Sequence, residues 1–156
     1  MGRGPVTRDM RSWYPMLTPS RLAVATTLLQ VFGEGKRVPE GWDRKLQGAD
    51  AHLAQALLGL VLRRWGRLRA WVKPRLKDPE RGVPLGTELA LAMGLAQLAW
   101  LEGVAPHAAV HEGVTQVADP HLGFPPHRGL VNALLRRASA DREALRAELE
   151  ALPASL

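Results

Sequence analysis

The sequence predicts an all-α fold of about six to seven helices, and three observations support this prediction. Apolar residues recur at intervals of three and four in several segments, which is the period of a helix that packs on one side. Glycine and proline are concentrated between those segments, where they end one helix and begin the next. No segment shows the alternation of a strand, and no internal repeat is evident. The 156 residues, 46% of them hydrophobic, are enough for one globular unit with its own core.

The segment 85–117 is predicted to form two helices joined by a tight corner, at the centre of the bundle. In the first of them, apolar residues cover nearly the whole circumference, as in a helix that is buried on all sides. Thr87 is the expected cap of this helix and Gly103 its expected end. Pro106 suits the first turn of the second helix because it lacks a backbone N–H. Small residues should let neighbouring helices approach closely: Ala92, Gly94, Ala96, Ala108 and Ala109.

Helices are also predicted ahead of this segment. Thr18 and Pro19 should begin the first helix, as its N-cap and its first helical residue, and the helix should end near Phe32 at a glycine-rich loop. A further helical segment covers 49–72. Gly66 is expected to break or bend it, so that a short third helix completes the segment.

Two more helices follow a loop rich in proline and glycine. The segment 128–138 carries leucine and valine at helical spacing and should pack on the core through that side. The last helix begins at Ser139 or Asp141, either of which can cap it, and runs to about Leu152.

Charge and cysteine content limit the classes of function. The formal net charge is +6, with arginine far more frequent than lysine, and this favours an anionic partner because guanidinium binds phosphate bidentately. A genome rich in G and C would also produce this composition. Cysteine is absent, which excludes disulfides, thiolate metal ligands and a cysteine nucleophile. No secretory signal or membrane-spanning run is evident, so we expect a soluble, cytoplasmic protein that does not contact a membrane.

Basic residues are concentrated in three places. Residues 1–17 have no helical period and should form a flexible basic arm, in which Trp13 and Tyr14 add rings for base stacking. A disordered tail, or rings that simply dock on the domain, is the commoner explanation of such an arm. The segment 63–81 is the densest basic run, and a solvated face explains it nearly as well as RNA contact does.

The third place is the predicted helix over 128–138. Arg128, Asn132 and Arg136 are four residues apart, so they share one helix face that suits an RNA backbone. Asn132 is better explained as a buried amide that bonds to the neighbouring helix through Glu112, because buried amides need partners. The arginines of this helix then remain available to a ligand.

One pair of histidines has the spacing of a zinc site. His107 and His111 are four residues apart, beside Glu112. A third ligand is not evident and the HExxH order is missing, so we predict no metal site and a local hydrogen-bonding role for His107.

Residues in three consecutive segments carry a family resemblance: Leu95, Gln97 and Leu98; Pro106, His107, Ala108, Ala109, Val110, Glu112 and Val114; Leu130, Val131, Asn132, Leu135 and Arg136. Taken in order, they are similar to NusB-like domains. The closest similarity is to the amino-terminal domain of the RsmB/Sun family of ribosomal RNA cytosine-5 methyltransferases. The resemblance covers residues 18–140.

The resemblance implies a NusB-like helical bundle of two small subdomains over 18–156, with RNA binding as its role. The RNA would be ribosomal or boxA-like, in rRNA processing or in transcription antitermination and the regulation of transcription. A ribosomal protein or a methyltransferase subunit is an implied partner. The chain ends at Leu156 without the glycine-rich cofactor loop and the cysteine of a methyltransferase, so we expect no cofactor and no enzymatic activity. The alternative is a protein-interaction module that binds a methyltransferase, a ribosomal protein or a second copy of itself as a homodimer, with RNA contact incidental.

The expected RNA contacts are basic side chains, because phosphate contacts dominate affinity for nucleic acid. They lie in the arm, the first helix, the 63–77 segment and the 128–138 helix. The residues are Arg8, Arg11, Arg21, Arg63, Arg64, Arg67, Lys73, Arg75, Arg128, Arg136 and Arg137.

Overall fold

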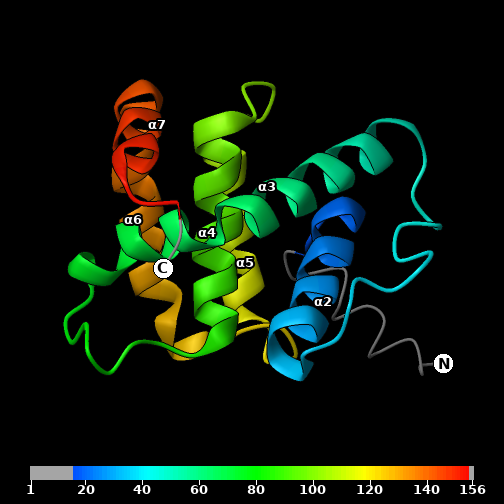
Figure 1. Cartoon of the computed structure of the whole chain (residues 1–156), viewed down its shortest axis with the longest axis horizontal. Coiled ribbons are helices and arrows are strands. Elements are labelled where there is room, and N and C mark those ends of the chain that lie inside the picture. The colour runs from blue at the N-terminus through cyan, green and yellow to red at the C-terminus, as the bar shows by residue number, and fades with distance from the viewer. Residues whose placement is uncertain (1–15, 155–156) are drawn as a thin grey trace, which may run out of the picture.

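The computed structural model describes residues 16–154. All regular secondary structure in this range is helical (Figure 1). Six α-helices and two 3-10 turns follow one another, with no strand between them in this part of the chain. The predicted all-α fold is therefore confirmed. The elements are α2 (Pro19–Glu34), α3 (Gly48–Val72), η1 (Lys73–Arg75), α4 (Leu85–Trp100), α5 (Pro106–Ala118), η2 (Pro125–His127), α6 (Arg128–Ser139) and α7 (Arg142–Ala151).

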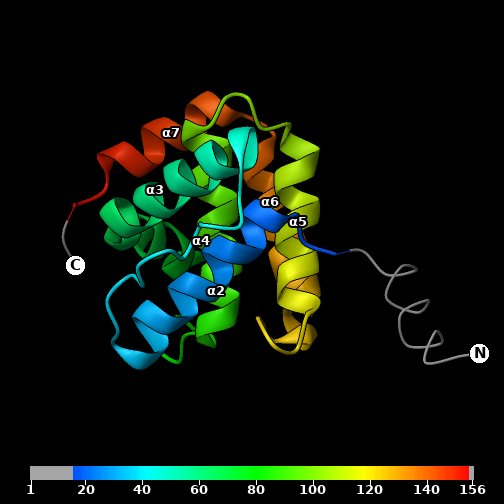
Figure 2. The same ribbon diagram turned by 90° about the vertical axis from the view of Figure 1, so that its right-hand side faces the viewer.

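Helix α4 is the centre of the molecule. It contacts α2, α3, α5, α6 and α7, and in both ribbon views it lies among them (Figures 1 and 2). Every residue over 89–99 is buried. A helix that is apolar on all sides has no face to turn to water, so the other helices pack around it, and its predicted central position is confirmed.

Two glycines, one on α4 and one on α5, make room for a leucine of α6. A Cβ added at Gly94 would lie 2.7 Å from Leu135 Cδ1, and one added at Gly113 would lie 2.5 Å from the same atom. Both distances are too short for carbon atoms, so only glycine leaves room for this leucine. Leu135 therefore fixes α6 against its neighbours, which holds the opposite, exposed face of α6 in a defined position.

The ends of α4 differ from the prediction. The helix begins at Leu85 with Pro84 as its N-cap, so Thr87 is not the cap. Thr87 is buried, and its Oγ1 lies 2.9 Å from His127 Nδ1, which joins α4 to η2. At its other end α4 stops at Trp100, three residues before Gly103, where a side chain from α7 binds its last carbonyl groups as described below.

The bend in the second helical segment is also displaced from its predicted place. α3 is one helix with a kink at Arg64, where φ is −117° and ψ is 19°, and not at Gly66. The guanidinium carbon of Arg64 lies 4.6 Å from the centre of the Trp100 ring. The kink therefore coincides with a contact between α3 and α4, which the local sequence does not show.

Two other helix boundaries were anticipated to within a few residues. α2 runs two residues past Phe32, and Gly35 ends it in the left-handed conformation at φ 68°. Asp141 caps α7, since its side chain accepts a hydrogen bond from the Ala144 N–H at 3.0 Å, which decides between the two predicted caps.

None of the helices over 16–154 has both the length and the apolar composition that crossing a bilayer requires.

Candidate nucleic-acid interface

Three arginines of α6 point away from the core. Arg128, Arg136 and Arg137 are exposed, whereas the opposite side of the helix is buried through Val131, Leu134, Leu135 and Ala138. Within residues 16–154 no side chain forms an ion pair or a hydrogen bond with any of the three guanidinium groups. Their charges are therefore available to an anionic ligand.

Two grooves follow this side of the molecule. One, of about 580 Å³, lies between α5 and α6, and Asn132 and Arg136 line it from α6. The second, of about 550 Å³, has Arg128 in its wall. His111 and Val114 of α5 line both grooves, so the two are parts of one surface. We call it the α5–α6 surface and define it by the residues that line the two grooves; Arg137 follows Arg136 on α6 and lines neither groove.

The chain described here begins at one end of the α5–α6 surface. Met16 and Leu17 line the second groove together with Arg128. Figure 2 shows the start of the described chain running past α5 towards α2. Arg8 and Arg11, which we predicted as contacts, lie outside the described residues.

Asn132 does not have the environment that we predicted. Its side chain is partly exposed in the groove and makes no hydrogen bond within residues 16–154, so the expected bond to Glu112 is wrong. Glu112 instead accepts hydrogen bonds from Thr18 at the start of α2. The arrangement of Arg128, Asn132 and Arg136 on one accessible helix face is as the spacing predicted.

Arg21 was expected on a positive surface of the first helix, and this placement is wrong. It is only 8% exposed, its Nε donates to Gln97 Oε1 at 2.7 Å, and its Nη1 lies 3.8 Å from Glu112 Oε1. Burial lowers the pKa of Arg21 and the charge of Glu112 opposes that change. Because its guanidinium serves α4 and α5 inside the molecule, Arg21 is not available to a surface ligand.

The basic run at the end of α3 is largely engaged with the protein. Arg64 lies over the Trp100 ring, and Arg67 Nε donates to the carbonyl oxygen of Leu152 at 3.1 Å. Arg75 Nη1 donates to the Trp71 carbonyl at 2.6 Å and its guanidinium carbon lies 3.8 Å from the centre of the indole ring. These three predicted contacts are bound to the chain itself.

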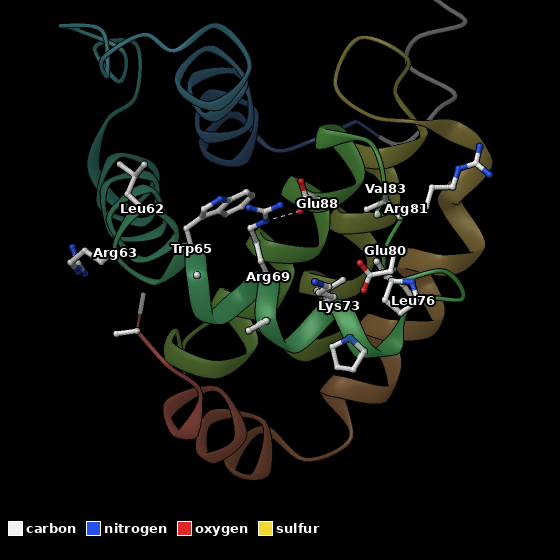
Figure 3. A pocket seen from close by; sticks show the side chains of 17 residues that line it. Leu62, Arg63, Trp65, Arg69, Lys73, Leu76, Glu80, Arg81, Val83 and Glu88 are labelled. Atoms are coloured by element: carbon white, nitrogen blue, oxygen red, sulfur yellow. Dashed lines mark hydrogen bonds and ion pairs between the residues drawn. The ribbon is translucent and has the colours of Figure 1, made fainter. Parts of the chain in front are cut away.

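Other cations of this run border a cleft of about 1070 Å³ between α3, η1 and the loop before α4 (Figure 3). Arg63 and Lys73 line it and are exposed, without an ion pair in the part of the chain that the structure describes. Glu80 and Glu88 line the same cleft, and Arg69 Nε donates to Glu88 Oε2 at 2.9 Å. The cleft therefore mixes both signs of charge, and so does the α5–α6 surface, since Asp119 lines its second groove together with Arg128.

Two arginines of α7 have a structural role that we did not predict from the sequence. Arg142 donates hydrogen bonds to carbonyl oxygens in the last turn of α4 and in the loop after it, at Gln97, Leu98, Leu101 and Val104. Arg146 Nε donates to the Ala99 carbonyl at 2.7 Å. The carbonyl oxygens of Gln97 and Leu101 also accept backbone hydrogen bonds, whereas those of Leu98, Ala99 and Val104 have only the arginines as partners. One signal was available: an arginine in the first turn of a helix meets the positive end of the dipole, so another contact must favour it.

Within residues 16–154, no three acidic or histidine side chains converge as a metal site would require. His107 and His111 instead line the groove between α5 and α6. The predicted absence of a metal site stays a prediction.

Comparison with known proteins agrees with the resemblance in the sequence. Residues 18–140 match the model of the NusB family. Ribosomal RNA small subunit methyltransferase B of Pseudomonas syringae pv. tomato is 37% identical over 135 residues, which cover 83% of this chain and 29% of that protein. The enzyme of that name from Vibrio cholerae is 31% identical over 131 residues, covering 82% of this chain and 30% of the relative. The chain thus spans about 30% of the length of such relatives.

The fold has a solved counterpart as well. NusB of T. maritima superimposes with a TM-score of 0.66 at 16% sequence identity, over 88% of this chain and 100% of the other. An identity this low shows the fold alone. Because the family model matches most of the chain, this protein belongs to the NusB family.

Proposed function

We propose that this chain is an RNA-binding domain that acts through the α5–α6 surface and does not itself catalyse a reaction. The observation that carries the proposal is the set of three exposed α6 arginines, none of which has a protein partner within residues 16–154. Three unneutralised guanidinium groups on one helix suit a phosphate backbone, whose binding is driven by release of counterions.

The geometry of the surface supports a single strand as the ligand. Arg128 and Arg136 are eight residues apart, about 12 Å along the helix axis, on the same face of α6. Between them, Asn132 offers an amide donor and an acceptor that suit the edge of a base. Apolar side chains of Val110 and Val114 form the facing wall. Phosphate contacts would thus lie at both ends and a base-sized apolar surface in the middle.

The relatives suggest which RNA is bound. Their names describe methyltransferases of small-subunit ribosomal RNA, so we propose ribosomal RNA as the ligand class, with antitermination-type RNA as the alternative. A ribosomal protein or a methyltransferase subunit is the partner we propose, and the cytoplasm is the location. Since most of the length of the relatives lies outside the matched region, we assign catalysis of methyl transfer to that other part.

A second candidate function is protein binding at the cleft beside α3. Trp65 lines this cleft and stacks on Phe32, with ring centroids 4.3 Å apart, and Arg63 and Lys73 border it. An aromatic residue surrounded by a polar rim is typical of a protein interface. A salt-resistant protein partner in a pull-down, together with weak RNA binding of no preference, would favour this function over the first.

The experiment for the proposed function is a titration of labelled ribosomal RNA fragments with the protein, compared with scrambled RNA of equal length, over a range of salt concentrations. A steep salt dependence with a clear preference for one fragment supports specific RNA binding. A steep salt dependence without preference for one RNA would show only that the surface is basic. The absence of measurable RNA binding would overturn the proposal.

A further inference from the structure

We infer that the cleft between α3, η1 and the loop before α4 binds an acidic amphipathic helix of a protein partner. Apolar side chains of that helix would enter the cleft, and its carboxylates would meet the cations at the cleft's ends. The inference deepens the second proposed function, protein binding at this cleft, and rests on it. No residue that lines the two grooves of the α5–α6 surface also lines this cleft, so the two surfaces can be tested separately.

The uncharged lining of the cleft is mostly aliphatic. Its aliphatic and proline side chains come from α3, η1 and the loop before α4, and they are Leu62, Val72, Pro74, Leu76, Pro79 and Val83. Trp65 is the only aromatic residue among the described residues that line the cleft, and its ring already stacks on Phe32. Single-stranded RNA binds chiefly by stacking its bases on aromatic rings. An aliphatic lining therefore suits the apolar face of a polypeptide better than it suits RNA.

The charged residues that line the cleft leave an excess of positive charge. Arg69 and Glu88 form an ion pair at 2.9 Å, so their charges offset each other. Glu80 is the one further acidic residue in the lining. Three exposed cations of the lining make no ion pair within residues 16–154, namely Arg63, Lys73 and Arg81. Because the potentials of two partners are complementary across an interface, this excess favours an acidic partner.

Two of the unpaired cations lie at opposite ends of the cleft. Figure 3 shows Arg63 at one end of the labelled side chains and Arg81 at the other, with Trp65 between them. Lys73 follows Arg63 by ten residues, which corresponds to about 15 Å of helix. A partner helix of three turns has the same length. Apolar residues at helical spacing would fill its middle, with a carboxylate near each end.

A helix fits this cleft better than an extended peptide does. An extended peptide binds mainly by adding a strand to the edge of a sheet, and residues 16–154 contain no strand. A helix satisfies its own backbone hydrogen bonds and presents only side chains to its partner. The partner would thus pack on α3 as the amphipathic helices of the bundle pack on one another.

The test begins with a selection on the immobilised full chain from a phage library of random peptides of about sixteen residues, long enough for several helical turns. We expect the enriched peptides to be acidic, with apolar residues at helical spacing, and to gain helix on binding, as circular dichroism would show. Changing Arg63, Lys73 and Arg81 to Glu should weaken their binding at least about tenfold, because like charges then face each other.

The matched control carries the same change in net charge on α6, with Arg128, Arg136 and Arg137 changed to Glu. It should bind the peptides within about twofold of the native chain but lose affinity for RNA, whereas the cleft variant should show the opposite pattern.

A second variant tests the apolar lining without changing charge. Ala70 is half-buried and lines the cleft, so Ala70→Leu places a larger side chain where the partner should bind. It should weaken peptide binding about tenfold, and Ala70→Ser, which hardly changes the volume, less than about threefold. Thermal unfolding shows that each variant is folded at the temperature of the assay.

The results separate this inference from both proposed functions. Enriched peptides that are basic, or that lack helical apolar spacing, yet lose affinity for the Ala70→Leu variant would overturn the acidic helix and leave protein binding at the cleft in place. If no peptide is enriched, or if the cleft variants bind the peptides as the native chain does, protein binding at the cleft is overturned as well. RNA binding by α6 is measured independently and is unaffected by either result.

Discussion

The end of α3 and the helix α6 are both rich in arginine, yet the structure uses them differently. At the end of α3 and in η1, Arg64, Arg67 and Arg75 bind indole rings and backbone carbonyls of their own chain. On α6, the arginines have no such partners within residues 16–154. In the denser basic run of the sequence, several arginines are thus already bound within the chain, whereas all three arginines of α6 are available to a ligand.

This difference shows that a count of cations along the sequence overestimates a binding surface. An arginine close to tryptophan rings or to the end of a helix binds those groups of its own chain. Burying part of its side chain and pairing its N–H groups stabilise the fold, so its charge is less available to a ligand. An arginine on the outer face of a helix that packs only through its inner side has no such groups of its own chain to bind. The α6 arginines belong to this second kind.

The largest effect is expected when the charges of each region are reversed in turn. Changing Arg128, Arg136 and Arg137 to Glu should weaken RNA binding about 100-fold at low salt, because three phosphate contacts become repulsive. The matched control changes three exposed cations of the other region, Arg63, Lys73 and Lys77, to Glu and should weaken binding less than about fivefold. Fluorescence anisotropy titrations measure both. Equal losses would remove the distinction between the two regions.

A second prediction concerns an arginine that serves the fold. Arg142→Ala removes hydrogen bonds to four carbonyl oxygens near the end of α4 and leaves two of them, those of Leu98 and Val104, without any donor, so the free energy of unfolding should fall by about 2 kcal/mol. RNA affinity of the folded protein should not change. Urea denaturation measures the stability, with the exposed Arg137→Ala as a control that should alter it by no more than about 0.5 kcal/mol. If the control lost as much stability as the variant, the α6 arginines would not be free.

The α3 arginines should behave like Arg142, on a smaller scale. Arg64→Ala and Arg67→Ala remove a contact with an indole ring and a hydrogen bond to the Leu152 carbonyl, respectively. Each should lower the free energy of unfolding by about 1 kcal/mol, and neither should change RNA affinity more than about twofold. Paired denaturation and binding curves check this. Weaker binding without any loss of stability would place these residues on the RNA surface after all.

The smallest effect is expected from Asn132, which lies between the two groove arginines of α6. Asn132→Ala should weaken binding of a preferred RNA fragment about threefold and leave a scrambled RNA unaffected, because an amide reads a base edge while phosphate contacts are indifferent to sequence. Competition titrations with the two RNAs measure the ratio. A loss shared equally by both RNAs would argue against base contact.

The helices of this fold could largely be predicted from the sequence, and the environments of its polar residues could not. Apolar spacing identified α4 as the buried centre, because a helix without a polar face must be covered by other helices on all sides. The positions of Thr87, Arg21 and Glu112 depend on which elements meet in space, as when Glu112 bonds to a threonine 94 residues away. The kink at Arg64 likewise arises beside a tertiary contact.

For the candidate surface, helical periodicity placed Arg128, Asn132 and Arg136 on one face, because the period of a helix is fixed by its backbone. The sequence did not separate these arginines from those of α3. That separation depends on Trp100 and the backbone near Leu152, which come from other parts of the fold, and on Trp71, which lies four residues before Arg75.

The most direct test of the distinction is the salt dependence of RNA affinity in three proteins: the native chain, one with Arg128, Arg136 and Arg137 changed to Ala, and one with Arg63, Lys73 and Lys77 changed to Ala. Each lost phosphate contact on a single strand should reduce the slope of log affinity against log salt by about 0.7. We therefore predict a slope smaller by about 2 for the α6 variant and nearly unchanged for the α3 variant. A native slope in the α6 variant, or the larger reduction in the α3 variant, would contradict the assignment of RNA binding to α6.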